Sequence, residues 1–232
     1  MARKIKKTDQ TKPWNRRAST DKHYRLESRN IISKRFLIVC EGVNTEPCYF
    51  QSFPVQTAEV KTFGLGRSKM SLVEYVIDLV GQEPKKDPDQ EVWIVFDMDL
   101  NHLKDFTLQQ KDFNDAVRLA KANRFQVAYS NDAFELWFLL HYQLLESALT
   151  RLEYYERLSK LWGISYDRQG KGVPFCRSVY NRLLEDQSAS QETAIRNAER
   201  LFQQKAEVLP SEQNPCTTVY QLVKELNKYL RK

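Results

Sequence analysis

One segment constrains the fold of this chain more than any other: residues 91–101, with the sequence Glu-Val-Trp-Ile-Val-Phe-Asp-Met-Asp-Leu-Asn. Consecutive apolar residues at 93–96 are typical of a strand buried on both faces, as in a parallel sheet covered by helices. Where this strand leaves the sheet, its two-residue period places Asp97 and Asp99 on one side and Met98 on the other. Two adjacent carboxylates repel each other unless a cation lies between them. The segment therefore predicts a central strand that ends in a cation site, with a solvated acid pair in a turn as the alternative.

A second apolar run also ends in an acid. Residues 35–42 read Arg-Phe-Leu-Ile-Val-Cys-Glu-Gly, a buried-strand pattern in which Gly42 allows a sharp turn directly after Glu41. Parallel strands end at one edge of the sheet, where α/β proteins bind their ligands. We therefore expect Glu41 to lie beside Asp97 and Asp99. Oxygen ligands of this kind suit a magnesium ion, with water and phosphate oxygens completing its shell.

Strands and helices alternate along the first part of the chain. Apolar periodicity predicts further strands at 58–64 and 125–130, and helices at 46–53, 70–80 and 107–123. This alternation is typical of a parallel α/β sheet. From Thr150 onward, apolar residues recur almost entirely at helical spacing. The predicted fold class is α/β, with a parallel sheet flanked by helices and a C-terminal helical subdomain.

The charge of the chain is concentrated at its N-terminus. The formal net charge is +6, yet residues 1–35 contain 12 Lys and Arg against three acids, net +9, which leaves 24 against 27, net −3, for residues 36–232. We expect a basic arm at 1–30, an α/β core at 31–148 and a helical subdomain at 149–232. Such an arm can neutralise nucleic-acid phosphates without reading sequence. A solubilising or partner-docking tail is the alternative.

Other features of the sequence bear on the compartment. No run of about 18 apolar residues is present, so no membrane span is expected. The charged N-terminus has no apolar stretch of the secretory type. The cysteines lack metal-ligand spacing and are interpreted as reduced, mostly buried thiols: Cys40, Cys48, Cys176 and Cys216. The expected location is the cytoplasm.

Two basic loops are candidate phosphate contacts. Residues 64–69, Gly-Leu-Gly-Arg-Ser-Lys, join a predicted strand to a helix, where backbone amides can cradle a phosphate and Arg67 and Lys69 can hold it. The segment is not a Walker A motif, and a tight turn is the alternative. Farther along, Arg168 and Lys171 lie in a Gly-containing loop that either reaches substrate or serves as a solvated connector.

The segment 130–141 admits two interpretations. Asp132 and Glu135 have the spacing of a capping-box-like helix start, which would explain Glu135 without chemistry. Asn131 and Glu135 also follow a strand end, near the place where the acids should gather. His141 falls on an apolar helical stripe and is predicted to be packed and hydrogen-bonded. Glu46, at the start of an earlier helix, is interpreted as complementing the helix dipole.

Three groups of motifs along the chain fit one known pattern. They are Cys-Glu-Gly at 40–42 followed by Thr-Glu and Tyr-Phe, Phe-Asp-Met-Asp at 96–99, and Ser-Asn-Asp-Ala-Phe-Glu-Leu-Trp-Phe-Leu-Leu-His at 130–141. Together they resemble the RloB-like family of prokaryotic Toprim-fold proteins. In the wider Toprim group, a glutamate after the first strand and an Asp-x-Asp after a later strand hold magnesium. Glu41, Asp97 and Asp99 match those positions, and Glu135 matches a family signature as a second-metal or general-base candidate.

The resemblance implies a function. It points to a Toprim-like (Rossmann-like) core acting as a magnesium-dependent nuclease, with manganese possible in place of magnesium, which cleaves RNA such as tRNA, or DNA, in defence against phage. The expected partners are the nucleic acid, an ATPase protein and a second copy of the chain. Asn131, Arg67, Lys69, Arg168 and Lys171 are the expected substrate contacts. The alternatives are a non-catalytic nucleic-acid-binding subunit of a defence complex and a nucleotidyl transferase or primase-like enzyme.

Overall fold

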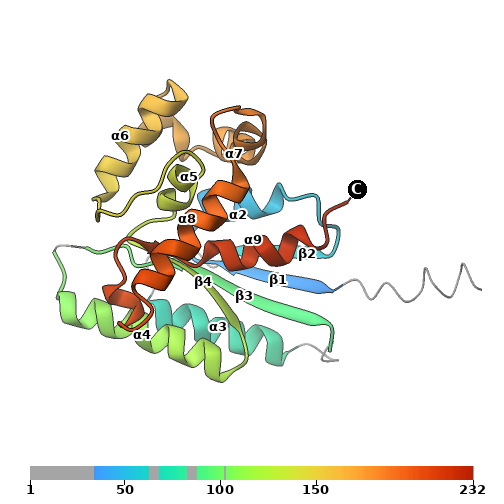
Figure 1. Cartoon of the computed structure of the whole chain (residues 1–232). Coiled ribbons are helices and arrows are strands. Elements are labelled where there is room, and N and C mark those ends of the chain that lie inside the picture. The colour runs from blue at the N-terminus through green and yellow to red at the C-terminus, as the bar shows by residue number, and fades with distance from the viewer. Residues whose placement is uncertain (1–33, 63–67, 83–87, 102, 232) are drawn as a thin grey trace, which may run out of the picture. The chain divides into compact units, whose positions relative to one another are not determined.

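A five-stranded sheet with the order β2-β1-β3-β4-β5 lies at the centre of the described part of the chain (Figure 1). The computed structural model describes residues 34–62, 68–82, 88–101 and 103–231. Four strands are parallel: β1 Arg35–Cys40, β2 Ala58–Thr62, β3 Gln90–Asp97 and β4 Gln126–Asn131. The predicted α/β class is confirmed, and β3 lies between β1 and β4 as expected. The predicted basic arm at 1–30 falls outside the described residues.

The fifth strand corrects the sequence analysis. β5, Cys216–Thr217, pairs antiparallel with the end of β4, whereas a parallel sheet was expected; the other elements beyond Thr150 are helical, as predicted. Ser130 faces Thr217 in this pairing and Asn131 faces Cys216. A strand of two residues is too short to produce a visible two-residue alternation, so the sequence carries no local signal for it.

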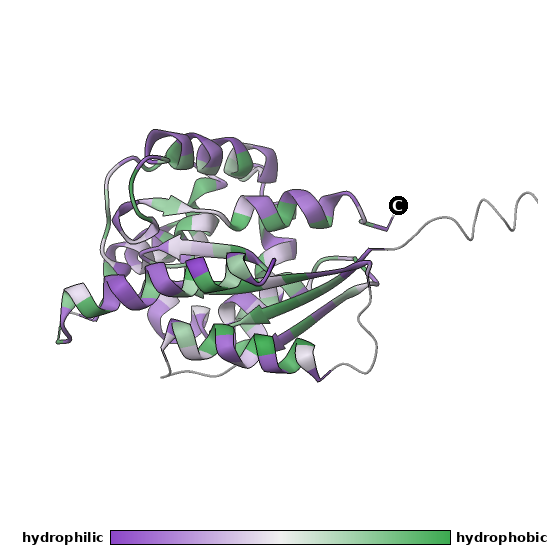
Figure 2. Ribbon diagram, turned by 90° about the horizontal axis from the view of Figure 1, so that it is seen from below, coloured by the Kyte–Doolittle hydropathy of each residue, from purple (hydrophilic) through white to green (hydrophobic). Residues whose placement is uncertain are grey.

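Helices cover both faces of the sheet (Figure 1). On one face, α3 Lys69–Gly81 and α4 Phe106–Ala122 pack against the apolar residues of β1 and β3 that point their way, such as Leu37 and Ile94. Phe36 and Trp93 point to the opposite face. The elements that share that core are α2 Thr45–Gln51, α5 Glu135–Leu140, α6 Arg151–Trp162, α7 Val173–Glu185, α8 Gln191–Gln204 and α9 Val219–Asn227. Figure 2 shows largely apolar strands between helices that alternate apolar and polar residues.

Several helix ends follow their expected chemistry. Ser68 caps α3, since its hydroxyl oxygen accepts a hydrogen bond from the Ser71 amide at 3.1 Å. Gly163 ends α6 in the left-handed conformation, with φ of 65°, where glycine carries no steric cost. The capping-box interpretation of Asp132 and Glu135 is wrong. α5 starts at Glu135 without a side-chain cap, so Glu135 has no capping role to explain its presence.

The C-terminal helices and the sheet share one apolar core. Residues Lys34–Lys232 cluster as a single compact unit. The larger core contains side chains from both sides of the predicted 148/149 boundary, among them Phe36, Trp137 and Leu226. All four cysteines are buried and free, as predicted. None of the described helices is long and apolar enough to cross a membrane.

Candidate active site

A pocket of about 140 Å³ lies where β1 and β3 end. Five carboxylates line it: Glu41, Glu46, Asp97, Asp99 and Glu135. The basic side chains of Arg151 and Lys171 line it as well. Such a density of acids in so small a space is costly without compensating positive charge.

Strand geometry brings the three predicted acids together. The Glu41 amide donates to the Val95 carbonyl at 2.9 Å, which continues the pairing of β1 with β3 to the acid itself. Asp97 is the last residue of β3, and Met98 packs into the core beside α3 and α4 while Asp97 and Asp99 line the pocket. Asp97 and Met98 therefore alternate as expected. Asp99 lies beyond the end of β3, and together with Glu41 and Asp97 it lines one pocket at this edge of the sheet.

The backbone at Asp99 has an unusual conformation. Its φ is 48°, a left-handed value that Asp adopts more readily than most residues but that still carries strain. The segment around Asp132 holds it there: the Asp99 amide donates to the Asp132 carbonyl at 3.0 Å, and the Leu100 amide donates to the Asp132 carboxylate at 2.9 Å. This anchoring turns the Asp99 carboxylate into the pocket.

Asp97 is a desolvated carboxylate with an incomplete set of partners. Its Oδ2 accepts a hydrogen bond from the Phe134 amide at 2.9 Å, whereas its Oδ1 is buried with no hydrogen-bond partner in the described part of the chain. Burial, and then the charges of Glu46 and Glu135, raise the pKa of Asp97 well above its usual value. An orphaned, buried carboxylate oxygen is the kind of atom that a bound cation satisfies.

Glu46 belongs to the pocket, although the sequence analysis assigned it to the helix dipole. It lies in the first turn of α2 and is only 8 % exposed. Burial, together with the charges of Glu135 and Glu41, raises its pKa to about 7. Gly42 leaves space for this side chain, because a Cβ at that position would collide with the Glu46 carboxylate. The sequence signal that could have pointed to Glu46 is the Thr45-Glu46 pair that follows Cys-Glu-Gly in the motif.

Three basic side chains from separate elements reach the acids. Lys69 Nζ lies 2.6 Å from Glu41 Oε1, and Arg151 Nη2 lies 2.6 Å from Asp99 Oδ1. Lys171 Nζ lies 3.8 Å from Glu135 Oε1 and 4.7 Å from the centre of the Tyr155 ring. Lys69 and Lys171 were predicted as substrate contacts. Arg151 was not, because it sits at a helix start where only the apolar stripe was considered.

Glu135 is held by the C-terminal helical part. The side chain is 4 % exposed, and its Oε1 accepts a hydrogen bond from the Tyr166 hydroxyl at 3.1 Å. Tyr166 is fully buried and begins a π-helical turn, Tyr166–Gly170. Gly170 packs flat against its ring, since a Cβ there would collide with the ring atoms. The C-terminal helical part therefore contributes directly to the pocket, through the Tyr166 contact with Glu135 and through Arg151 and Lys171.

The match to a family model extends over most of the chain. The model of the RloB-like protein family aligns with residues 36–226. The chain belongs to the RloB-like family. The aligned region contains every residue that lines the acidic pocket and all of the sheet except Arg35, the first residue of β1. None of the curated proteins or solved structures compared with the chain matches it.

Two predicted substrate contacts of this RloB-like chain, Asn131 and Arg168, lie away from the pocket. Arg67 falls outside the described residues. Asn131 is buried and points away from the acids, since its Nδ2 donates to the carbonyls of Pro210 at 3.2 Å and Ser211 at 2.9 Å. Arg168 is exposed and does not line the pocket.

His141 behaves as the sequence analysis of this RloB-like chain expected. It is buried, and its Nδ1 lies 2.9 Å from the Trp137 carbonyl oxygen. Burial lowers the pKa of His141 to about 4. The imidazole is therefore uncharged at neutral pH and belongs to the core.

The donor chemistry of the pocket fits a hard divalent cation, but the side chains are not grouped for one. Carboxylate oxygens are the ligands that magnesium prefers, and Asp97 supplies an unpartnered one. Over the described ranges, no three Asp, Glu, His or Cys side chains are close enough to hold a metal ion. The RloB-like pocket thus combines suitable ligands with an arrangement in which Glu41 and Asp99 are paired with basic side chains.

Proposed function

We propose that this RloB-like protein is a metal-dependent nuclease of the Toprim type, which hydrolyses phosphodiester bonds of nucleic acid in the cytoplasm during defence against phage. One observation carries the proposal: Glu41, Asp97 and Asp99 share a pocket at the ends of β1 and β3, and a buried Asp97 oxygen there has no hydrogen-bond partner among the residues that the structure describes. Membership of the RloB-like family supports it, since the matched region contains all three acids.

Four acids of the pocket and the three basic side chains that reach them have roles in this proposal. Glu41, Asp97 and Asp99 would hold magnesium or manganese, which when bound polarises a phosphate and lowers the pKa of water. Arg151, Lys69 and Lys171 bind phosphate oxygens through charge-assisted hydrogen bonds. Glu135, oriented by the Tyr166 hydroxyl, positions the attacking water.

Substrate and partners form part of the same proposal. The substrate is RNA such as tRNA, or DNA, and the net charge of +9 on residues 1–35 supports affinity for a phosphate backbone. An ATPase protein and a second copy of the chain are the proposed partners. Neither partner contributes a residue to the chemistry described above.

Nuclease assays with a matched substitution test the proposal. Wild type, Asp97→Asn and Asp115→Asn are incubated with magnesium, manganese or chelator, and with plasmid DNA, single-stranded DNA or total tRNA. Asp115 is a suitable control because it pairs with Lys111 and Arg118 on α4, outside the pocket. We expect metal-dependent cleavage by wild type and Asp115→Asn, and none by Asp97→Asn. Cleavage that survives in Asp97→Asn or in chelator would refute the assignment.

The ion pairs of Glu41 and Asp99 favour one second candidate, a subunit that binds nucleic acid without cleaving it. In that case the acids serve only to hold Lys69 and Arg151 in place. The same samples distinguish the two functions. Binding of an oligonucleotide by wild type and Asp97→Asn alike, with no cleavage and no metal-dependent thermal stabilisation, supports the binding subunit.

A further inference from the structure

Two of the three proposed metal ligands are each paired with a basic side chain. The pair of Lys69 and Glu41 measures 2.6 Å, with side-chain exposures of 12 % and 15 %. The pair of Arg151 and Asp99 also measures 2.6 Å, with exposures of 32 % and 48 %. Asp97, which lines the same pocket, has no such partner for its Oδ1 among the described residues. Lys69 and Arg151 therefore pair with Glu41 and Asp99 and not with Asp97 Oδ1.

This pairing explains why the acids are not grouped. A divalent cation needs oxygens of Glu41, Asp97 and Asp99 turned toward one point. The ammonium group of Lys69 and the guanidinium group of Arg151 instead draw Glu41 and Asp99 toward themselves. A basic side chain and a metal ion also repel each other, so the two compete for the same carboxylate.

The location of the two basic residues points to a second ligand. Lys69 is the first residue of α3 and Arg151 is the first residue of α6. A cation there is unfavourable for the helix, because the amino end of the helix dipole is positive. In α3 the first backbone amides are already used, since those of Lys69 and Met70 donate to the Asp112 carboxylate and that of Ser71 to Ser68. A phosphate would therefore contact the basic side chains rather than these amides. Helix stability therefore does not account for these two residues; their ion pairs with Glu41 and Asp99 do, and a substrate phosphate is the ligand that can compete for them.

We propose that Lys69 and Arg151 hold the site in a resting state, in which they occupy Glu41 and Asp99 until a substrate phosphate draws them away and frees the acids for the metal. The inference rests on the proposed function, since it concerns regulation of that site. Phosphate accepts a guanidinium in bidentate form, so it competes well with a single carboxylate oxygen. Metal and phosphate then raise each other's affinity, as linkage requires.

Manganese binding to the full-length protein tests the proposal without using activity. Free Mn²⁺ is measured by electron paramagnetic resonance during titration of wild type, Arg151→Gln, Lys69→Gln and Arg151→Lys. Removing either competitor should tighten Mn²⁺ binding about tenfold, which corresponds to ~1.4 kcal/mol. Arg151→Lys should stay close to wild type. Urea denaturation of each variant verifies that it is folded.

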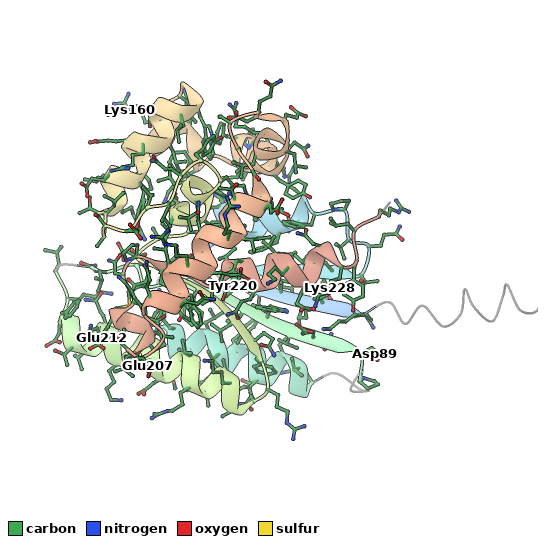
Figure 3. The ribbon with its side chains drawn as sticks, viewed as in Figure 1. Asp89, Lys160, Glu207, Glu212, Tyr220 and Lys228 are labelled. Atoms are coloured by element: carbon green, nitrogen blue, oxygen red, sulfur yellow. The ribbon has the colours of Figure 1, made fainter. Side chains whose placement is uncertain are left out.

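Two control variants separate occupation of the acids from a general loss of positive charge. Lys160→Gln alters the far end of the same helix, where Lys160 points outward (Figure 3), and should leave Mn²⁺ affinity unchanged. Lys171→Gln removes a charge inside the pocket whose partner is Glu135, and should tighten binding much less than Arg151→Gln.

The outcomes distinguish this inference from the proposed function. Tighter Mn²⁺ binding in Arg151→Gln and Lys69→Gln, lost when Asp97→Asn is added, supports both. Wild-type binding that disappears in Asp97→Asn but is equal or weaker in Arg151→Gln overturns the resting state and keeps the metal site. Absence of Mn²⁺ binding in every variant overturns both.

Discussion

Removing the hydroxyl group of Tyr166 should destabilise the fold through a single contact. Tyr166→Phe keeps the buried ring and its packing, so the loss is the hydrogen bond to Glu135 Oε1 at 3.1 Å. A hydrogen bond to a charged group contributes about 1.5–3 kcal/mol, and a carboxylate that is 4 % exposed cannot replace it fully with water. Burial and the charge of Glu135 raise the pKa of Tyr166 well above its usual value, which keeps it a donor. We expect a loss of about 2 kcal/mol.

Urea denaturation followed by fluorescence measures this loss, and the slope of the transition should stay unchanged because the same surface is exposed. Tyr180→Phe is the matched control, since the Tyr180 hydroxyl makes no hydrogen bond to any described residue, and should change the free energy of unfolding by less than about 0.5 kcal/mol. In a Glu135→Gln background, the cost of Tyr166→Phe should fall to about 1 kcal/mol. Equal costs in the two backgrounds would show that the contact with Glu135 is not the cause.

Three further predictions concern stability. The pKa of His141 is lowered to about 4 from 6.5, so its neutral form should contribute stability above pH 6.5 that is lost as the pH falls toward 4. An NMR titration of the imidazole should show this pKa, and a midpoint near 6.5 would contradict the prediction. Thr150→Ala removes the capping box with Glu153 and should cost about 1 kcal/mol in thermal denaturation, whereas no change would mean that the cap is dispensable. Leu37 is fully buried in β1, so Leu37→Ala should lower the free energy of unfolding by about 2–5 kcal/mol. Leu152 is 67 % exposed, so Leu152→Ala should lower it by less than about 0.5 kcal/mol. Similar urea midpoints for the two variants would contradict the core assignment.

The central part of the fold could be predicted because its signals are local. β1 and β3 are buried on both faces, and each appears in the sequence as an uninterrupted apolar run that stops at an acid. Two parallel neighbours must then end at one edge, so Glu41 and Asp97 could be placed together without knowledge of the remaining chain. The two-residue period extended the prediction to Asp99.

The other residues of the site could not be placed from the sequence, because their positions depend on tertiary contacts. Asn131 was taken as a pocket residue because it ends β4, yet Asp97 lies opposite Ser130, so Asn131 points to the other face. An acid at a helix start is usually explained by the helix dipole, and this explanation was applied to Glu46. Its role in the pocket, where it interacts with Glu135, was therefore missed. Arg151 reaches Asp99 across more than 50 residues of sequence, and no local pattern specifies such a contact. These residues lie where local rules and the function proposed for the site disagree.

The short strand β5 has a consequence for how the protein is made. It closes the free edge of β4, and Thr218 adds a hydrogen bond from its amide to the Tyr129 carbonyl. When translation has reached Lys171, the acids of the pocket and their basic partners have all been made. The residues that pair with the edge of β4 come later, at 216–218. Until residues 216–218 have been made, a growing chain therefore carries an open edge of β4, which is a template for pairing with other chains. Translation must therefore pass Thr217 before β5 can pair with β4, and termination before Cys216 would leave this edge of β4 unpaired.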